Sequence, residues 1–323
     1  MQRRKFLGLL SISSAAAALG GSVVWQLSAN NRISAVLEDM PTSATEMSAA
    51  VQRMSGVAPD RLNYLQSFQA ASGSGSGSAL DAETQLTRYL EKMNNFEYSY
   101  GEDVLLSETQ RPLLVESFKR IDRVQSLVGH GNFNVLGFDD MLRYSRQNES
   151  VGAFTPQELD FLESLFFDDV ERYGFYGEKV IDSLTAVVSS RDRIKVSRTG
   201  HFLFKGQSEE IYKKIRQDVG DSIVLTSGIR GIVKQTHLFL AKTIQSNGNL
   251  SLASRSLAPP GHSFHGVGDF DVGKVGFGAK NFTADFSGTE EFHQLVDLGY
   301  LTIRYPEENL LGVRYEPWHI KVV

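Results

Sequence analysis

The stretch "PPGHSFHGVGDFDVG", from Pro259 to Gly273, places two histidines and two aspartates among glycines and prolines. Glycine and proline interrupt helices and strands, so the segment is predicted to be an irregular turn. Imidazole and carboxylate are side chains that bind divalent metals. The segment contains none of the common helical zinc motifs. Its spacing alone therefore fits a metal site and a surface loop with incidental histidines equally well.

The composition limits which kinds of site the chain can build. It has 323 residues, no cysteine and a formal net charge of −5. Without cysteine, disulfides, thiolate zinc sites and a cysteine nucleophile are excluded, so any metal must be held by histidine and carboxylate. The acidic balance, with no long basic stripe, argues against a nucleic-acid partner.

The N-terminus, "MQRRKFLGLL", places Arg3 and Arg4 before an apolar, alanine-rich run that ends near Trp25. This pattern resembles a twin-arginine export signal. We therefore expect residues 1–29 to be a signal peptide and the protein to work in the periplasm or cell envelope. The alternative, in which the same residues stay as a membrane anchor or tether, remains open.

Two regions of different character follow the N-terminal segment. Residues 30–79 are polar and end in the linker-like run "ASGSGSGSA". Residues 80–190 show apolar residues at helical spacing and are predicted to be a helical region. Within it, Thr155, Pro156 and Glu158 predict a capping box at the start of one helix. Neither the role of this region nor a protein partner for it follows from the pattern.

Residues 191–323 mix helices and strands without a regular βαβ rhythm. Helical patterns cover 208–220 and 231–248, a β-rich run covers 221–228, and strands are predicted at 299–305 and 311–323. This mixture favours an α+β domain over a doubly wound one. We also expect Ile320–Val323 to pair with neighbouring strands, because a free terminus frays unless it is tied into a sheet.

The segment "YEPWHI" adds Glu316 and His319 to the metal-capable residues of the turn. A catalytic zinc takes three protein ligands and leaves one position open, with a carboxylate nearby to accept a proton from water. Two histidines, an aspartate and a separate glutamate meet that need.

Three separated blocks carry a resemblance to a known family. They are "SGIRGIVKQ" from Ser227, "PGHSFHGVGDFDV" from Pro260, and "LGYLTIRYPEENLLGVRYEPWHIKVV" from Leu298. In this order, over about residues 200–323, they resemble the VanY-type D-alanyl-D-alanine carboxypeptidase family of zinc peptidases. Its wider group includes lysostaphin-like enzymes and the Hedgehog fold. The resemblance implies a small, mostly antiparallel sheet with flanking helices.

The resemblance also implies roles for individual residues. The implied zinc ligands are His265, Asp271 and His319. Glu316 is the implied general base, and Arg230 the residue that polarises or clamps a substrate oxygen. The implied substrate contacts are Ser227, Gln235, Ser263 and Trp318.

The ligand register departs from the family pattern by one residue. The family usually has six residues between its first histidine and the aspartate, whereas His265 and Asp271 are separated by five. The pair His262 and Asp269 has the usual separation. We prefer His265 and Asp271, because Ser263 then falls in register and Asp271 lies between apolar neighbours.

The expected function is that of an exported, zinc-dependent peptidase acting on peptidoglycan stem peptides as a D,D-carboxypeptidase. An endopeptidase with the same site is an alternative, as is L,D specificity, and the sequence separates neither. A non-catalytic, zinc-stabilised binding module is a third possibility. Glu316 argues against that module, because a purely structural zinc site needs no base.

Overall fold

The computed structural model describes residues 79–307 and 309–323. Contacts divide the chain into two compact units, of which the described parts are 79–87 for the first and 88–307 with 309–323 for the second. The predicted signal segment 1–29 lies outside the described residues, as does the polar segment 30–79 apart from its last residue. Those two predictions therefore stay as they are.

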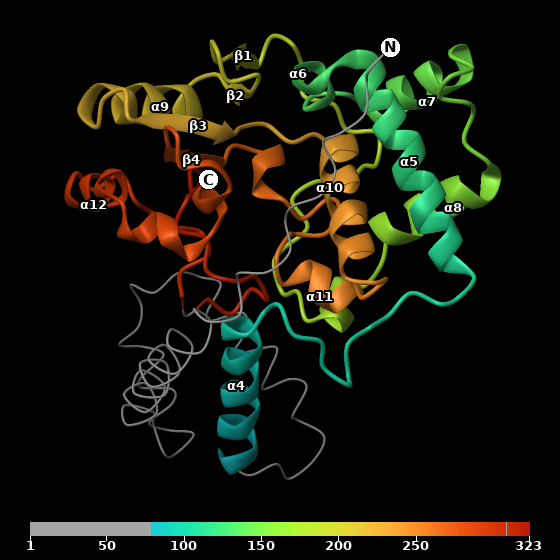
Figure 1. Ribbon diagram of the computed structural model, residues 1–323, viewed down its shortest axis with the longest axis horizontal. Coiled ribbons are helices and arrows are strands. Elements are labelled where there is room, and N and C mark those ends of the chain that lie inside the picture. Colours follow the sequence, from blue (N-terminus) through green and yellow to red (C-terminus); the bar gives the residue numbers. More distant parts are fainter. Residues whose placement is uncertain (1–78, 308) are drawn as a thin grey trace, which may run out of the picture. The chain divides into compact units, whose positions relative to one another are not determined.

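Helices account for most of the regular structure (Figure 1). The α-helices are α4 (Ala79–Asn94), α5 (Gln110–Val128), α6 (His130–Phe133), α7 (Phe138–Gln147), α8 (Pro156–Phe166), α9 (Gln207–Asp218), α10 (Ile232–Gln245), α11 (Leu250–Ser254) and α12 (Glu290–Asp297). The 3-10 helices are η1 (Val170–Tyr173), η2 (Phe264–Gly266), η3 (Gly278–Phe282) and η4 (Ala284–Gly288). None of the helices in the described part of the chain combines the length and apolar character of a membrane span.

Helix α8 begins as its sequence predicts. The Thr155 hydroxyl accepts a hydrogen bond from the Glu158 N–H at 3.2 Å, and the Glu158 carboxylate accepts one from the Thr155 N–H at 2.7 Å. Pro156 occupies the first turn, where a missing N–H costs nothing. The carboxylate of Glu158 also pairs with Arg120 of α5 at 3.1 Å, so the cap fixes α8 against its neighbour.

One apolar core joins the helical region to the C-terminal part of the chain. Helix α5 packs against both α8 and α10. The fully buried side chains of this core include Ile121 and Val124 of α5 together with Phe239 and Leu240 of α10. The boundary between 190 and 191 stays a prediction, but this core contains residues from both sides of it, so α5 helps to hold α10 in place.

The sheet that carries the site has three antiparallel strands, in the order β3 (Ile223–Ser227), β4 (Phe270–Lys274) and β5 (His319–Ile320). A separate antiparallel pair joins β1 (Arg193–Lys195) to β2 (Phe202–Phe204). A second apolar core lies around the three-stranded sheet and includes residues of α9 and α12. This combination of helices and small antiparallel sheets, after a helical region, is the α+β architecture that the sequence predicted.

The C-terminal strands are shorter than predicted. Of the expected strand 299–305 only an isolated bridge between Ile303 and Ile320 forms, and of 311–323 only β5 is regular. Gly312 has a positive φ of 80° and Pro317 has no N–H to donate, so the backbone before β5 cannot follow an extended ladder.

The last residues are nevertheless tied down, as expected. Ile320 pairs with Phe270 of β4, and the Lys321 N–H donates to the Thr302 carbonyl at 2.8 Å. The Val322 N–H donates to the Asp269 carboxylate, also at 2.8 Å. The terminal segment is therefore held from both sides, partly by a side chain and not by strands alone.

Gly312 lies where the segment that leads to Glu316 meets the helical region. A Cβ at this position would lie 2.0 Å from the Gly174 carbonyl oxygen, whereas a Cβ at Gly276, which has a similar φ of 79°, would meet nothing within 4 Å. Gly276→Ala should therefore lower the free energy of unfolding by about 1 to 2 kcal/mol through φ alone. Gly312→Ala should lower it by roughly 3 kcal/mol or more, because the backbone must also move. Chemical denaturation of both variants measures the difference, and equal losses would contradict this close approach.

Candidate metal and active site

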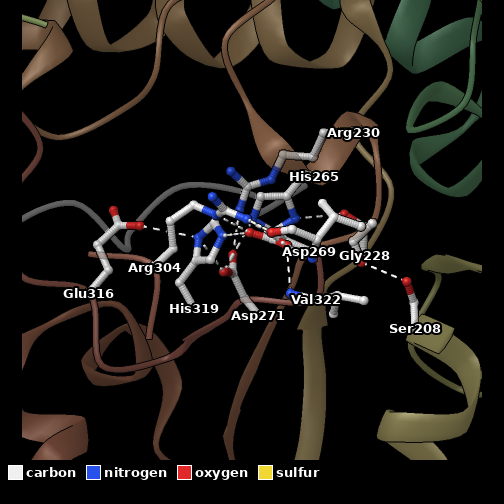
Figure 2. Close-up of polar contacts among 12 residues, drawn as sticks. Ser208, Gly228, Arg230, His265, Asp269, Asp271, Arg304, Glu316, His319 and Val322 are labelled. Carbon is white, nitrogen blue, oxygen red and sulfur yellow. Dashed lines mark hydrogen bonds and ion pairs between the residues drawn. The ribbon is translucent and has the colours of Figure 1, made fainter. Parts of the chain in front are cut away.

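Three acceptor atoms from three separate segments converge in the described structure (Figure 2). His265 comes from η2 in the glycine-rich turn, Asp271 from β4 and His319 from β5. All three are buried, and their candidate ligand atoms lie within 4.8 Å of one another. Asp271 Oδ1 is 3.2 Å from His265 Nε2 and 3.4 Å from His319 Nδ1. These are the three residues that the resemblance implied as ligands.

The strand register produces this convergence. Asp271 pairs with His319 across β4 and β5, and with Ser227 across β3 and β4. Directly opposed residues in an antiparallel pair have their side chains on the same face, only about 5 Å apart. Two of the three acceptors are therefore brought together by backbone pairing alone.

Hydrogen bonds on the far side of each imidazole fix which nitrogen faces the cluster. His265 Nδ1 lies 2.8 Å from the Gly228 carbonyl oxygen, which can only accept, so Nδ1 carries the proton. His265 Nε2 then presents a lone pair. Both His265 Nε2 and Asp271 Oδ1 are buried without a hydrogen-bond partner among the described residues. Acceptors that face one another in this way are satisfied by a cation between them.

His319 is oriented by Asp269. Its Nε2 donates to Asp269 Oδ2 at 3.0 Å, which leaves Nδ1 directed at Asp271. The Asp269 carboxylate is fully buried and also accepts hydrogen bonds from Arg304 and from the Val322 N–H. Asp269 therefore joins the orientation of His319 to the anchoring of the C-terminal segment.

The electrostatics of the cluster are those of a site that attracts cations. Burial alone would lower the pKa of His319, but hydrogen bonds to Asp269 and Glu316 and the charge of Asp271 raise it to about 9. Burial alone would raise the pKa of Asp271, but His265 and Arg230 hold it well below its usual range. Carboxylates thus stay ionised around the cluster, and without a metal they draw a proton onto His319.

A pocket of about 130 Å³ opens onto the three acceptors. Its lining consists of Arg230, Gln235, Ser256, Leu257, Ala258, Ser263, His265, Asp271, Phe282, Tyr305, Val313, Arg314, Glu316, Trp318 and His319. Every residue that the sequence analysis proposed for the site is in this lining except Ser227. Ser227 lies behind it, where its hydroxyl accepts a hydrogen bond from Arg230 Nε at 2.8 Å.

Glu316 and Arg230 approach the cluster from different segments. Glu316 Oε2 lies 3.4 Å from His319 Nδ1, and the Glu316 N–H donates to the Tyr305 carbonyl at 3.0 Å. The Arg230 guanidinium pairs with Asp271 Oδ2, on the side away from the cluster. A proton acceptor and a fixed positive charge thus lie at the same pocket as the three acceptors.

The other residues proposed to contact the substrate differ in their hydrogen bonding and burial. Gln235 Nε2 donates to the Ala258 carbonyl at 2.6 Å, while its Oε1 is buried without a partner among the described residues. Ser263 and Trp318 are buried and reach the pocket. The roles of these residues remain predictions.

The alternative ligand pair is not brought together. His262 Nδ1 lies 3.1 Å from the Gly177 carbonyl oxygen, and its ring packs edge-on against Phe175. Asp269 faces Arg304 and the far nitrogen of His319. The geometry therefore favours His265 and Asp271 over His262 and Asp269.

Three residues shape the site in ways that sequence reasoning did not predict: Asp269 was considered only as an alternative ligand, and Tyr305 and Arg314 were given no role. Asp269 orients His319, Tyr305 packs its ring edge-on against His319, and Arg314 lines the pocket. The Arg-Tyr-Pro run at 304–306 was the available signal for Tyr305. Nothing in the local pattern around Arg314 marks it as a pocket residue.

Comparison with known proteins places the site within a recognised domain. The family model described as VanY, D-alanyl-D-alanine carboxypeptidase, matches residues 206–323. No curated protein matches the chain significantly.

Three solved structures can be aligned with part of the chain. One is a mutant of the vancomycin resistance D,D-pentapeptidase VanY in complex with Zn(II), at 23% identity over 41% of this chain and 78% of that chain, with a TM-score of 0.33. The second is VanYB in complex with D-alanine-D-alanine, at 21% identity over 47% of this chain and 86% of that chain, with a TM-score of 0.36. The third is the LD-carboxypeptidase LdcB, at 22% identity over 47% of this chain and 71% of that chain, with a TM-score of 0.33.

The match at 206–323 spans every residue from Ser227 to His319 that builds the cluster and its pocket. The C-terminal part of this chain, residues 206–323, is therefore similar to the family described as VanY, D-alanyl-D-alanine carboxypeptidase, and this similar segment contains the site.

Proposed function

We propose that this chain is a zinc-dependent peptidase that hydrolyses peptidoglycan stem peptides and removes a C-terminal D-amino acid. The observation that carries the proposal is the convergence of His265, Asp271 and His319 at a pocket that also holds Glu316 and Arg230. The family match of the same segment supports the substrate class.

The residues of the cluster fit zinc. Two imidazole nitrogens and one carboxylate oxygen form a donor set that catalytic zinc sites use, with a fourth position left for water. The unpartnered His265 Nε2 and Asp271 Oδ1 would both be satisfied by the ion. When bound, zinc acts as a Lewis acid and lowers the pKa of a coordinated water towards ~7.

The protein's own groups divide the remaining work. Glu316 is the general base: its carboxylate, next to His319 in the pocket, accepts the proton of the attacking water. Arg230 supplies fixed positive charge for the negative charge that develops on the carbonyl oxygen of the substrate. Ser227 holds Arg230 Nε, so the guanidinium is oriented before substrate arrives.

Export is the second part of the proposal. Arg3 and Arg4 before an apolar run support passage through the twin-arginine route to the periplasm or cell envelope, where peptidoglycan is found. The same segment would serve as a membrane tether if it is retained. An endopeptidase would use the same residues, and analysis of cleavage products from purified muropeptides separates the two reactions.

Substitution of the proposed ligands tests the metal. The purified protein should contain about one zinc per chain by elemental analysis. His265→Ala and His319→Ala should each lose stoichiometric zinc, because two remaining ligands hold the ion poorly. His262→Ala, which changes a histidine of the same turn that faces Gly177, should retain it. Zinc retained by both ligand variants, or lost only from His262→Ala, would contradict the assignment. Far-UV circular dichroism checks that all three variants are folded.

Substitution of the proposed base tests the chemistry. Glu316→Gln keeps the size of the side chain but cannot accept a proton, so turnover should fall by about a hundredfold or more, the range of a general base. Zinc content should stay at the wild-type level, since Glu316 is not a ligand. Turnover close to wild type with zinc bound would move the role to another group.

A further inference from the structure

The pocket contains two arginines, and among the described residues only one of them forms an ion pair with a carboxylate. Arg230 pairs with Asp271. Arg314 has no carboxylate within ion-pair distance among residues 79–307 and 309–323, although Glu316 and Glu97 attract it from farther away, and its Nε is buried without a hydrogen-bond partner there. The Arg314 guanidinium makes one hydrogen bond among the described residues, in which Nη2 donates to the Phe282 carbonyl at 3.0 Å. A largely desolvated cation of this kind is complementary to an anionic ligand.

Two aromatic rings hold the Arg314 guanidinium in place. Its Cζ lies 4.8 Å from the centroid of the Phe96 ring and 4.9 Å from that of the Trp318 ring. Contacts of this kind stabilise a cation but use none of its N–H donors. Apart from the one hydrogen bond to Phe282, the N–H donors of the guanidinium therefore have no partner among the described residues, while the position of the group is fixed.

A buried ion pair between Arg255 and Asp103 connects the segment that carries Phe96 to the segment that carries Arg314. Arg255 donates to both carboxylate oxygens of Asp103, at 3.0 and 2.8 Å, and also to the Tyr98 carbonyl. The Arg255 carbonyl in turn accepts the Arg314 N–H at 2.8 Å. The segment that carries Phe96 and the segment that carries Arg314 are thus joined through a single pair, which is almost fully buried.

We propose that Arg314 is a specificity-determining residue that binds a free carboxylate of the substrate. Arg314 and Glu316 are two residues apart on one segment and line the same pocket, so a peptide cleaved there has groups within reach of both. A guanidinium edge matches a carboxylate with two parallel hydrogen bonds and has no such match to a neutral amide. This inference rests on the proposed function and deepens it: the enzyme prefers acidic peptides to neutral ones.

Two carboxylates of a stem peptide share this chemistry, the C-terminal one and a side-chain one. Three synthetic peptides ending in D-alanyl-D-alanine separate them: one with both carboxylates free, one amidated at the C-terminus and one amidated at the side chain. Their binding to zinc-loaded Glu316→Gln protein is measured by titration calorimetry, because that background binds substrate without consuming it.

In this background Arg314→Gln should weaken binding of the fully free peptide by about tenfold to a hundredfold, the effect of losing charge-assisted hydrogen bonds. One of the two amidated peptides lacks the carboxylate that Arg314 contacts, and the binding of that peptide should not change. The unaffected peptide therefore shows whether Arg314 binds the C-terminal or the side-chain carboxylate. Arg314→Lys keeps the charge but not the planar fork and should give a smaller loss. Arg143→Gln removes an arginine of α7 that also lies over an aromatic ring and should change nothing.

An equal loss for all three peptides, or no loss, would overturn the inference, since it would show that Arg314 only supports the aromatic arrangement. If Arg314→Gln unfolds, the Arg314→Lys comparison decides by the same criterion. Failure of the proposed function has a different signature: the zinc-loaded wild-type protein would cleave none of the three peptides while still binding them with the carboxylate preference.

Discussion

The antiparallel register that sets Asp271 opposite His319 is the constraint on which the site depends. It brings two of the three converging acceptors together by backbone pairing, and the β3 to β4 register adds Ser227 on the other side of Asp271. Asp269 precedes Asp271 by two residues, so the two side chains point to the same face. Asp269 can therefore reach the far nitrogen of His319 while Asp271 faces the near one.

This arrangement places buried acceptor atoms close together, which is unfavourable until a cation binds between them. Each group of the cluster uses its outer side for a hydrogen bond or ion pair with the protein, His265 with Gly228, Asp271 with Arg230 and His319 with Asp269. The inner atoms His265 Nε2 and Asp271 Oδ1 are then acceptors without donors among the described residues, which is costly in a buried place. Metal binding and the stability of the C-terminal segment should therefore be coupled, because Asp269 serves both.

Part of this could be predicted from the sequence because it depends on local chemistry. The capping box at Thr155 needs only residues three positions apart, and the turn around His265 is marked by its glycines and prolines. The short terminal strands were not predicted, since apolar alternation does not reveal that Gly312 and Pro317 interrupt pairing. The contact of Phe96 with Arg314 joins segments far apart in the chain and has no local pattern.

The central claim is that His265, Asp271 and His319 hold one zinc ion. Anomalous diffraction at the zinc absorption edge, on crystals of the zinc-loaded protein, tests it most directly. We predict a single strong peak about 2.0 to 2.2 Å from His265 Nε2, one Asp271 oxygen and His319 Nδ1. No peak at this cluster, or a peak that lies instead at His262 and Asp269, would contradict the account.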